Sequence, residues 1–232
     1  MTDLPHDITG FILAGGRSRR MGTDKARIPW GTGTLLTHAV DRMRHVTARL
    51  FAVGSVESAP VAVLPDLFAG DGPLRGIQTA LAQTATEWNL ILAVDMPLVS
   101  ASLLRFIAEQ CEDGVSAVVP VTTRRDATRR TAESSDNVDR AEPLRVRQPL
   151  CAAYHRRLLP DFERALSDGE YSIDSLLQRL STGIDDNEST AVRILDEREL
   201  ALAGFSADMF WNVNTPEDLD WARTLAANLN VY

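Results

Sequence analysis

Short apolar runs alternate with amphipathic segments along most of the chain, and this alternation restricts the fold more than any other feature. The apolar runs, each predicted to be a strand, lie at 8–14, 50–53, 61–64, 89–94 and 115–121. Apolar residues at helical spacing predict the intervening helices, which lie at 34–48, 74–86 and 101–112. Strands this apolar, separated by helices, are typical of a mainly parallel sheet that is covered on both faces. We therefore predict an α/β fold with its ligand site at the carboxyl ends of the strands.

The second half of the chain continues this pattern after an interruption. Residues 122–147 contain seven arginines and five acids without a clear period, which predicts a mobile surface insertion. Further strands are predicted at 149–155, 191–195 and 209–214, and further helices at 157–168 and 172–180. A final helix is expected to begin at Thr215, whose hydroxyl suits an N-cap before Pro216. Residues 1–232 are thus expected to form a single domain.

Composition excludes several classes of function. Hydrophobic residues make up 44% of the 232 residues, which is ordinary for a globular protein. The net charge of −8 argues against a general binder of nucleic acid or of anionic membranes. No apolar run approaches 18 residues and the first ten residues lack a signal-peptide pattern, so a cytoplasmic location is expected. The two cysteines, Cys111 and Cys151, are interpreted as small buried hydrophobic residues.

A glycine-rich basic loop follows the first predicted strand. Residues 17–27 carry five cationic side chains and one aspartate, a net charge of +4, and include Lys25, the single lysine among 24 basic residues. A cationic loop with accessible amides at the end of a strand suits a polyphosphate. The spacing matches neither the P-loop nor the dinucleotide-binding fingerprint. A solvated basic turn remains the alternative interpretation.

Polar residues follow two other apolar segments. Asp95 ends the run at 89–94, where a carboxylate could hold Mg²⁺ or simply cap the next turn. Asn212 and Asn214 would face the same side if 209–214 is a strand. The four histidines, in contrast, show no metal-ligand pattern, and surface or packing roles are expected for each; they are His6, His38, His45 and His155.

Several of these segments together resemble one family. LAGGRSRRMGTDKA at 13–26 is similar to the signature of the nucleotidyltransferases related to molybdenum cofactor guanylyltransferase, the MobA family. Shorter similarities follow in the same order, and they are GPLRG at 72–76, DMP at 95–97, QPLCAAY at 148–154 and NVNTPEDL at 212–219. The resemblance spans nearly the whole chain.

This resemblance implies a fold and a reaction. The fold would be a three-layer α/β/α, Rossmann-like nucleotidyltransferase fold of the glycosyltransferase-A-like type. The enzyme would transfer GMP from GTP to molybdenum-molybdopterin and release pyrophosphate, with Mg²⁺ as cofactor. Its further partners would be cofactor-delivery proteins and molybdoenzymes.

The resemblance also implies roles for single residues. Lys25 and Arg20 would bind the phosphates, and Asp95 would hold Mg²⁺ with help from Asn214. Backbone groups of Leu13, Ala14 and Gly15 would meet the guanine nucleotide, and Asp66 would contact the base or ribose. Asn212 and Asn214 are assigned to the acceptor side, and the segment 148–154 is expected on that side as well.

Two departures and two rival functions remain. Gly54-Ser55 stands where some members of the family carry an asparagine, and the insertion at 122–147 is longer than usual. One rival is a related enzyme that uses CTP or another phosphorylated acceptor. The other is a non-catalytic nucleotide-binding adaptor for cofactor delivery, against which Lys25, Asp95 and Asn214 argue because an adaptor needs no metal ligand.

Overall fold

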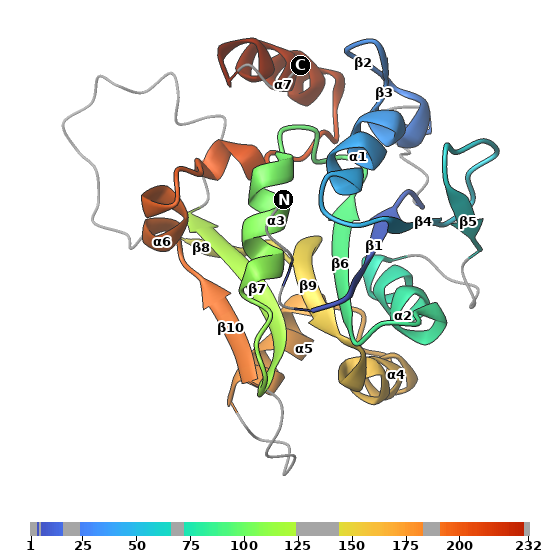
Figure 1. Ribbon diagram of the computed structural model, residues 1–232, viewed down its shortest axis with the longest axis vertical. Helices are drawn as coiled ribbons and strands as arrows, with labels where there is room; N and C mark the ends of the chain where they lie inside the picture. The colour runs from blue at the N-terminus through green and yellow to red at the C-terminus, as the bar shows by residue number, and fades with distance from the viewer. Residues whose placement is uncertain are drawn as a thin grey trace.

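The fold is built on one large mixed sheet (Figure 1). The computed structural model describes residues 4, 6–15, 24–65, 72–123, 144–182 and 191–229. Its eight strands lie in the order β10-β7-β9-β6-β1-β4-β5, and β8 pairs with β7. They are β1 (Ile8–Leu13), β4 (Arg49–Val53), β5 (Ala62–Leu64), β6 (Trp88–Ala93), β7 (Val115–Thr123), β8 (Arg145–Arg147), β9 (Cys151–His155) and β10 (Ala191–Leu195). A separate hairpin joins β2 (Pro29–Trp30) to β3 (Gly33–Thr34).

Helices cover both faces of this sheet. The α-helices are α1 (Leu35–Arg44), α2 (Pro73–Gln83), α3 (Ala101–Glu109), α4 (Leu159–Ser167), α5 (Ile173–Thr182), α6 (Glu197–Leu202) and α7 (Pro216–Leu229). The short 3₁₀ helices in the described part of the chain are η1 (Lys25–Arg27), η3 (Arg156–Leu158) and η4 (Ala207–Phe210). No helix among the described residues is both long and apolar enough to cross a membrane.

Two hydrophobic cores separate the layers. Ile8 and Ile12 of β1 face the core that is completed by α1, α3, α6 and α7. Phe11 and Leu13 of the same strand face the opposite core, which α2, α4 and α5 complete. Successive side chains of a strand point to opposite faces, so a strand with helices on both sides is apolar at most of its positions. The predicted α/β class, with a mainly parallel sheet, is confirmed.

The reversal of one central strand shapes the site. β1 runs parallel to both β4 and β6, and β10 runs parallel to β7. β9 is antiparallel to both of its neighbours, β6 and β7. Its beginning therefore lies at the carboxyl end of β6, where the Ala93 amide donates to the Leu150 carbonyl at 2.8 Å. The segment 148–150 thus reaches the ligand edge although it precedes its strand.

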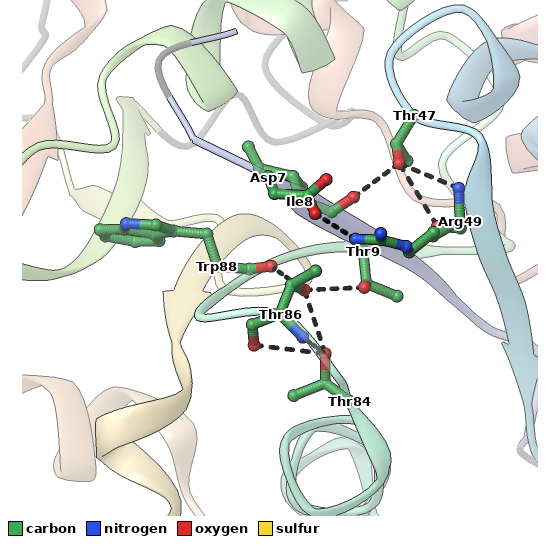
Figure 2. Close-up of polar contacts among 8 residues, drawn as sticks. All are labelled: Asp7, Ile8, Thr9, Thr47, Arg49, Thr84, Thr86 and Trp88. Carbon is green, nitrogen blue, oxygen red and sulfur yellow. Dashed lines mark hydrogen bonds and ion pairs between the residues drawn. The ribbon is translucent and has the colours of Figure 1, made fainter.

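The amino edge of the sheet is closed by threonine hydroxyls (Figure 2). Thr86 Oγ1 lies 2.7 Å from Thr9 Oγ1 and donates to the Trp88 carbonyl at 2.9 Å. Nearby, the hydroxyl of Thr47 donates to the Ile8 carbonyl at 2.6 Å. Buried hydroxyls need such partners, because an unpaired polar group loses its hydration without compensation. These bonds fasten the end of β1 that lies opposite the carboxyl edge.

Some predicted elements differ from the structure. The strand predicted at 209–214 is wrong, because residues 207–210 form η4 and residues 211–214 have no regular structure. The predicted insertion at 122–147 also begins and ends in regular structure, since Thr122 pairs with Val146 where β7 meets β8. Its residues 124–143 lie outside the described part of the chain. The hairpin at 29–34 and helix α6 were not predicted.

The final helix begins as predicted. Thr215 Oγ1 accepts a hydrogen bond from the Asp218 amide at 3.2 Å, and Pro216 is the first helical residue. This is the N-cap arrangement expected from the sequence, because the hydroxyl satisfies an amide that has no partner within the helix.

Candidate functional site

Lys25 begins the 3₁₀ helix η1, which forms the end of the basic loop at 17–27. Asp24 caps this helix, and its carboxylate accepts a hydrogen bond from the Ala26 amide at 3.0 Å. Ala26 is buried in the core between α1 and the sheet, so its packing fixes the helix against the body of the protein. The cap and this packing therefore fix the backbone position from which the Lys25 side chain extends.

Asp95 follows the central strand β6 in a turn. The Val213 amide donates to its backbone carbonyl at 2.8 Å, and the Val94 amide donates to the Leu13 carbonyl at 3.1 Å. Met96, the next residue, is buried. The backbone of Asp95 is therefore held on both sides, and its side chain stands at the carboxyl end of the strand.

Asn214 lies just before the last helix, where a carboxylate fixes its backbone. Asp218 Oδ2 accepts hydrogen bonds from the amides of Asn214 and Thr215 at 3.0 and 2.9 Å. Val213 beside it is buried and binds the Asp95 carbonyl. The cap of α7 thus holds Asn214 next to the turn that carries Asp95.

These three side chains meet at one point. Lys25 Nζ donates to Asp95 Oδ2 at 2.7 Å and to Asn214 Oδ1 at 2.8 Å. The side chains of Lys25 and Asp95 are only 16% and 18% exposed, so water screens their ion pair less than it screens a surface pair. The ammonium therefore stands where two oxygen ligands converge. Such a place suits a cation, and the ammonium could turn toward an anion if another cation replaced it.

The backbone after β1 passes very close to the loop after β4. The Ala14 amide donates to the Val53 carbonyl at 2.9 Å, which extends the pairing of these two strands. Gly54 has a φ of +123°, and a Cβ there would lie 2.6 Å from the Gly15 nitrogen. Glycine at position 54 therefore has a steric cause, because only glycine permits this conformation and this approach. Gly15 is exposed, so its backbone lies at the surface of the site.

Not every predicted residue joins this cluster. Asn212 Nδ2 donates to the Phe210 carbonyl at 3.3 Å, so this amide binds its own segment. The prediction that Asn212 and Asn214 share one strand face is wrong, because residues 211–214 do not form a strand. Arg27, counted in the basic patch, pairs instead with Glu57 at 2.9 Å on the exposed surface. Arg20 and Asp66 lie outside the described residues.

The segment on the predicted acceptor side lies at the same edge of the sheet. The side chain of Gln148 donates through Nε2 to Thr122 Oγ1 at 2.9 Å. Its backbone N–H donates to the Pro120 carbonyl at 2.8 Å. The Tyr154 hydroxyl donates to the Pro149 carbonyl at 2.8 Å, and burial raises the pKa of Tyr154. These contacts fix the turn that precedes β9, so this tyrosine acts as a support within the fold.

One residue near the site was not predicted to have a role there. His38 Nε2 lies 2.9 Å from the carbonyl oxygen of Pro97, two residues after Asp95. Its helical position predicted only a surface or packing role, and no feature of the local sequence indicates a contact with a turn 59 residues away.

The chain is similar to proteins of one known family. Residues 10–184 match the family described as "MobA-like NTP transferase domain". A relative from Pelotomaculum thermopropionicum, named "Probable molybdenum cofactor guanylyltransferase", is 33% identical over 95% of this chain and 94% of its own length. A relative from Desulfosudis oleivorans, named "Molybdenum cofactor guanylyltransferase", is 30% identical over 93% of this chain and 94% of its own.

Solved structures agree on the fold. A molybdopterin-guanine dinucleotide biosynthesis protein A from Archaeoglobus fulgidus superposes with a TM-score of 0.69 at 21% identity, covering 95% of this chain and 99% of that one. A 2-C-methyl-D-erythritol 4-phosphate cytidylyltransferase from Thermus thermophilus superposes with a TM-score of 0.62 at 20% identity, covering 94% and 98%. The family match covers most of the chain and the curated relatives align over almost their full length. The chain therefore belongs to the MobA-like NTP transferase family and is a nucleotidyltransferase.

Proposed function

We propose that this enzyme transfers GMP from GTP to molybdenum-molybdopterin, which yields the molybdopterin guanine dinucleotide cofactor and pyrophosphate. The names of its relatives support the reaction, since relatives that align over nearly the whole chain are named "Molybdenum cofactor guanylyltransferase" or "Probable molybdenum cofactor guanylyltransferase". The observation that carries the proposal here is the convergence of Lys25, Asp95 and Asn214 on one point.

The residues at this point fit a magnesium ion. Asp95 Oδ1 is buried, and no hydrogen-bond donor reaches it among the described residues. The Lys25 ammonium already lies between Asp95 Oδ2 and Asn214 Oδ1, so a positive charge is accommodated there. The described part of the chain contains no cluster of three or more acidic, histidine or cysteine ligands. A site with one carboxylate and one amide suits Mg²⁺, which keeps waters and takes the other ligands from substrate phosphates.

The chain's own residues would bind and orient the nucleotide. Lys25 would leave Asp95 and Asn214 and donate to the triphosphate, because a phosphate offers its ammonium more negative charge than one carboxylate does. The backbone of Leu13, Ala14 and Gly15 would meet the guanine nucleotide. When bound between Asp95 and Asn214, Mg²⁺ would neutralise charge on the phosphates.

Two further roles rest on the family resemblance. Arg20 would add a second cation to the phosphates, and Asp66 would contact the base or the ribose.

The acceptor would approach from the side of Gln148, Asn212 and Asn214. Delivery proteins and molybdoenzymes would then receive the dinucleotide cofactor.

The reaction itself is a substitution at the α-phosphorus. An oxygen of the acceptor's terminal phosphate forms a bond to that phosphorus, while the bond to the oxygen bridging the α- and β-phosphates breaks. The bridging oxygen keeps the electron pair and leaves as part of pyrophosphate. The protein supplies no covalent partner, so positioning and charge neutralisation provide the rate enhancement.

A nucleotide-preference assay tests the proposal. Purified enzyme is mixed with Mg²⁺, molybdopterin and either GTP, CTP or ATP, and the dinucleotide product is measured. We expect product with GTP, and at least a hundredfold less with Asp95→Ala, because losing one group that helps to stabilise charge in the transition state typically costs about 10²–10³ in rate. A preference for CTP would contradict the proposed base, and equal rates for wild type and Asp95→Ala would contradict the proposed site.

A further inference from the structure

His38 contacts the segment that directly follows Asp95, although the two residues belong to different elements. The histidine lies in the middle of α1, and its Nε2 atom is 2.9 Å from the carbonyl oxygen of Pro97. Two turns follow one another after β6: the Met96 amide donates to the Ala93 carbonyl across Asp95, and the Val99 amide donates to the Met96 carbonyl across Pro97. The contact therefore joins a helix on one face of the sheet to the turn directly after the one that carries the candidate metal ligand.

The chemistry of this bond fixes the proton on the ring. A carbonyl oxygen can only accept, so Nε2 must carry the hydrogen and donate. Burial, followed by the nearby positive charge of Arg42, lowers the pKa of His38. The ring is therefore neutral near pH 7, with its proton on Nε2.

The ring is also held from the side that carries Lys25. Trp30 lies edge-on to His38, with ring centroids 5.9 Å apart, and its side chain is buried. Trp30 belongs to the hairpin that directly follows η1. The imidazole therefore contacts both the hairpin that follows Lys25 and the segment that follows Asp95.

Helix α1 provides a rigid base for the histidine. Thr34 and Thr37 form a reciprocal capping box at its beginning, with Thr37 Oγ1 accepting from the Thr34 amide at 2.7 Å. Val40 and Met43 on the same helix are fully buried. A donor on such a helix can fix the turn more firmly than a donor on a loop, because its own backbone cannot follow the turn when it moves.

We propose that His38 is a positioning residue for the metal site: its Nε2–H donates to the Pro97 carbonyl and so fixes the segment 95–97, whose backbone sets the direction of the Asp95 side chain. This inference rests on the proposed role of Asp95 as a metal ligand. The Val213 amide holds the same segment at the Asp95 carbonyl, so the two bonds restrain residues 95–97 at both ends. Removal of the His38 bond frees one end, and the carboxylate then loses orientation while the fold remains.

Three variants separate this role from simple packing. His38→Phe keeps the ring and removes the donor, whereas His38→Gln places an amide N–H near the position of Nε2. Val40→Ala is the matched control, because it removes buried volume from the same helix without altering the contact to Pro97. The readout is the Mn²⁺ dissociation constant of the complex with a non-hydrolysable GTP analogue, taken from the free-Mn²⁺ signal in electron paramagnetic resonance.

We expect His38→Phe to raise the Mn²⁺ dissociation constant about tenfold, as the loss of partners that orient metal ligands commonly does. His38→Gln should recover most of this affinity, and Val40→Ala should lower the melting temperature with the affinity unchanged. Unchanged affinity in His38→Phe, or an equal shift in Val40→Ala, would overturn the proposal.

Two further measurements make the outcome unambiguous. Asp95→Asn should weaken Mn²⁺ binding, and if it does not, the proposed metal site fails together with any role for His38. If Asp95→Asn weakens binding while His38→Phe does not, only the positioning role is overturned.

On the wild-type protein, the ¹⁵N chemical shifts of the His38 ring should show the neutral form with the proton on Nε2. The form with the proton on Nδ1 would contradict the hydrogen bond to the Pro97 carbonyl.

Discussion

At the scale of single residues, the central feature is an ammonium that occupies a place suited to a metal ion. Lys25 contacts the oxygens of Asp95 and Asn214, and its chain position is 70 and 189 residues away from theirs. In the absence of nucleotide, the same contacts that neutralise Asp95 also oppose the entry of a divalent cation. Nucleotide and metal are therefore expected to bind together, because the phosphates attract Lys25 away from the carboxylate.

Lys25→Met should therefore strengthen Mn²⁺ binding when no nucleotide is present and weaken GTP binding. The gain in Mn²⁺ affinity should be about fivefold or more, because two charges about 4 Å apart interact by about 1 kcal/mol even in bulk water. Titration of Mn²⁺ by electron paramagnetic resonance measures this affinity, and circular dichroism should show an intact fold. Arg27→Met is the matched control, because it removes the same charge from the same 3₁₀ helix but from an exposed pair with Glu57. Equal effects of the two variants would contradict the account.

Gly54 makes a second prediction at this scale. Gly54→Ala combines a positive φ with a Cβ only 2.6 Å from the Gly15 nitrogen, so strain and overlap should together lower the free energy of unfolding by about 2–5 kcal/mol. Gly204→Ala is the control, since φ there is +88° but no atom lies within 4 Å of the added carbon. Urea unfolding should give a clearly larger loss for position 54. The same loss at both positions would mean that the approach to Gly15 has no energetic consequence.

At the scale of elements, the cap of α7 connects the last helix to the site. Asp218 holds the amides of Asn214 and Thr215, while its own amide is bound by the Thr215 hydroxyl. The loop before α7 is thus fixed although it belongs to no strand. The backbone before α7 is therefore held by the helix cap, and not by the pairing in the sheet that the apolar pattern of 209–214 predicts.

Asp218→Ala should weaken GTP binding in the presence of Mg²⁺, because it frees the backbone of Asn214. A loss of about 1 kcal/mol, which is typical of a removed helix cap, corresponds to about fivefold in the dissociation constant. Isothermal titration calorimetry measures the affinity. Glu217→Ala removes the neighbouring first-turn charge without these hydrogen bonds and should leave the affinity nearly unchanged. A comparable loss in Glu217→Ala would show that charge, and not the cap, is responsible.

Most strands could be predicted from the sequence, and the reasons are physical. A strand buried on both faces, such as β6, is apolar at nearly every position, with Asn89 as its one polar residue, so its letters alone identify it. The direction of β9 could not be predicted, because an apolar run does not show which strands it pairs with or whether the pairing is parallel or antiparallel. The contact of His38 with Pro97 was missed for a related reason: it joins residues that are remote in sequence.

At the scale of the whole molecule, the two edges of the sheet have different tasks. The carboxyl edge brings Lys25, Asp95 and Asn214 together, while the amino edge is closed by the threonine network around Thr86 (Figure 2). One basic loop, one turn and one helix cap converge at the site because β1 and β6 are adjacent and parallel. The site could be predicted as a set of residues, but only the fold gives their distances.

Thr86→Val tests this division. It removes a buried hydroxyl that bonds to Thr9, Thr84 and the Trp88 carbonyl, so it should lower the free energy of unfolding by about 1–3 kcal/mol. The GTP dissociation constant should stay unchanged, because the cluster lies at the opposite edge. Urea unfolding and calorimetry on the same sample measure both quantities. A large change in GTP affinity would contradict the separation of the two edges.

The fate of the phosphates tests the central claim most directly. Enzyme, Mg²⁺ and molybdopterin are incubated with GTP labelled at either the α- or the γ-phosphate, and the labelled products are separated. The account predicts that the α-label enters the dinucleotide cofactor and that the γ-label leaves in pyrophosphate. Release of the γ-label as orthophosphate, or failure of the α-label to reach the acceptor, would contradict it.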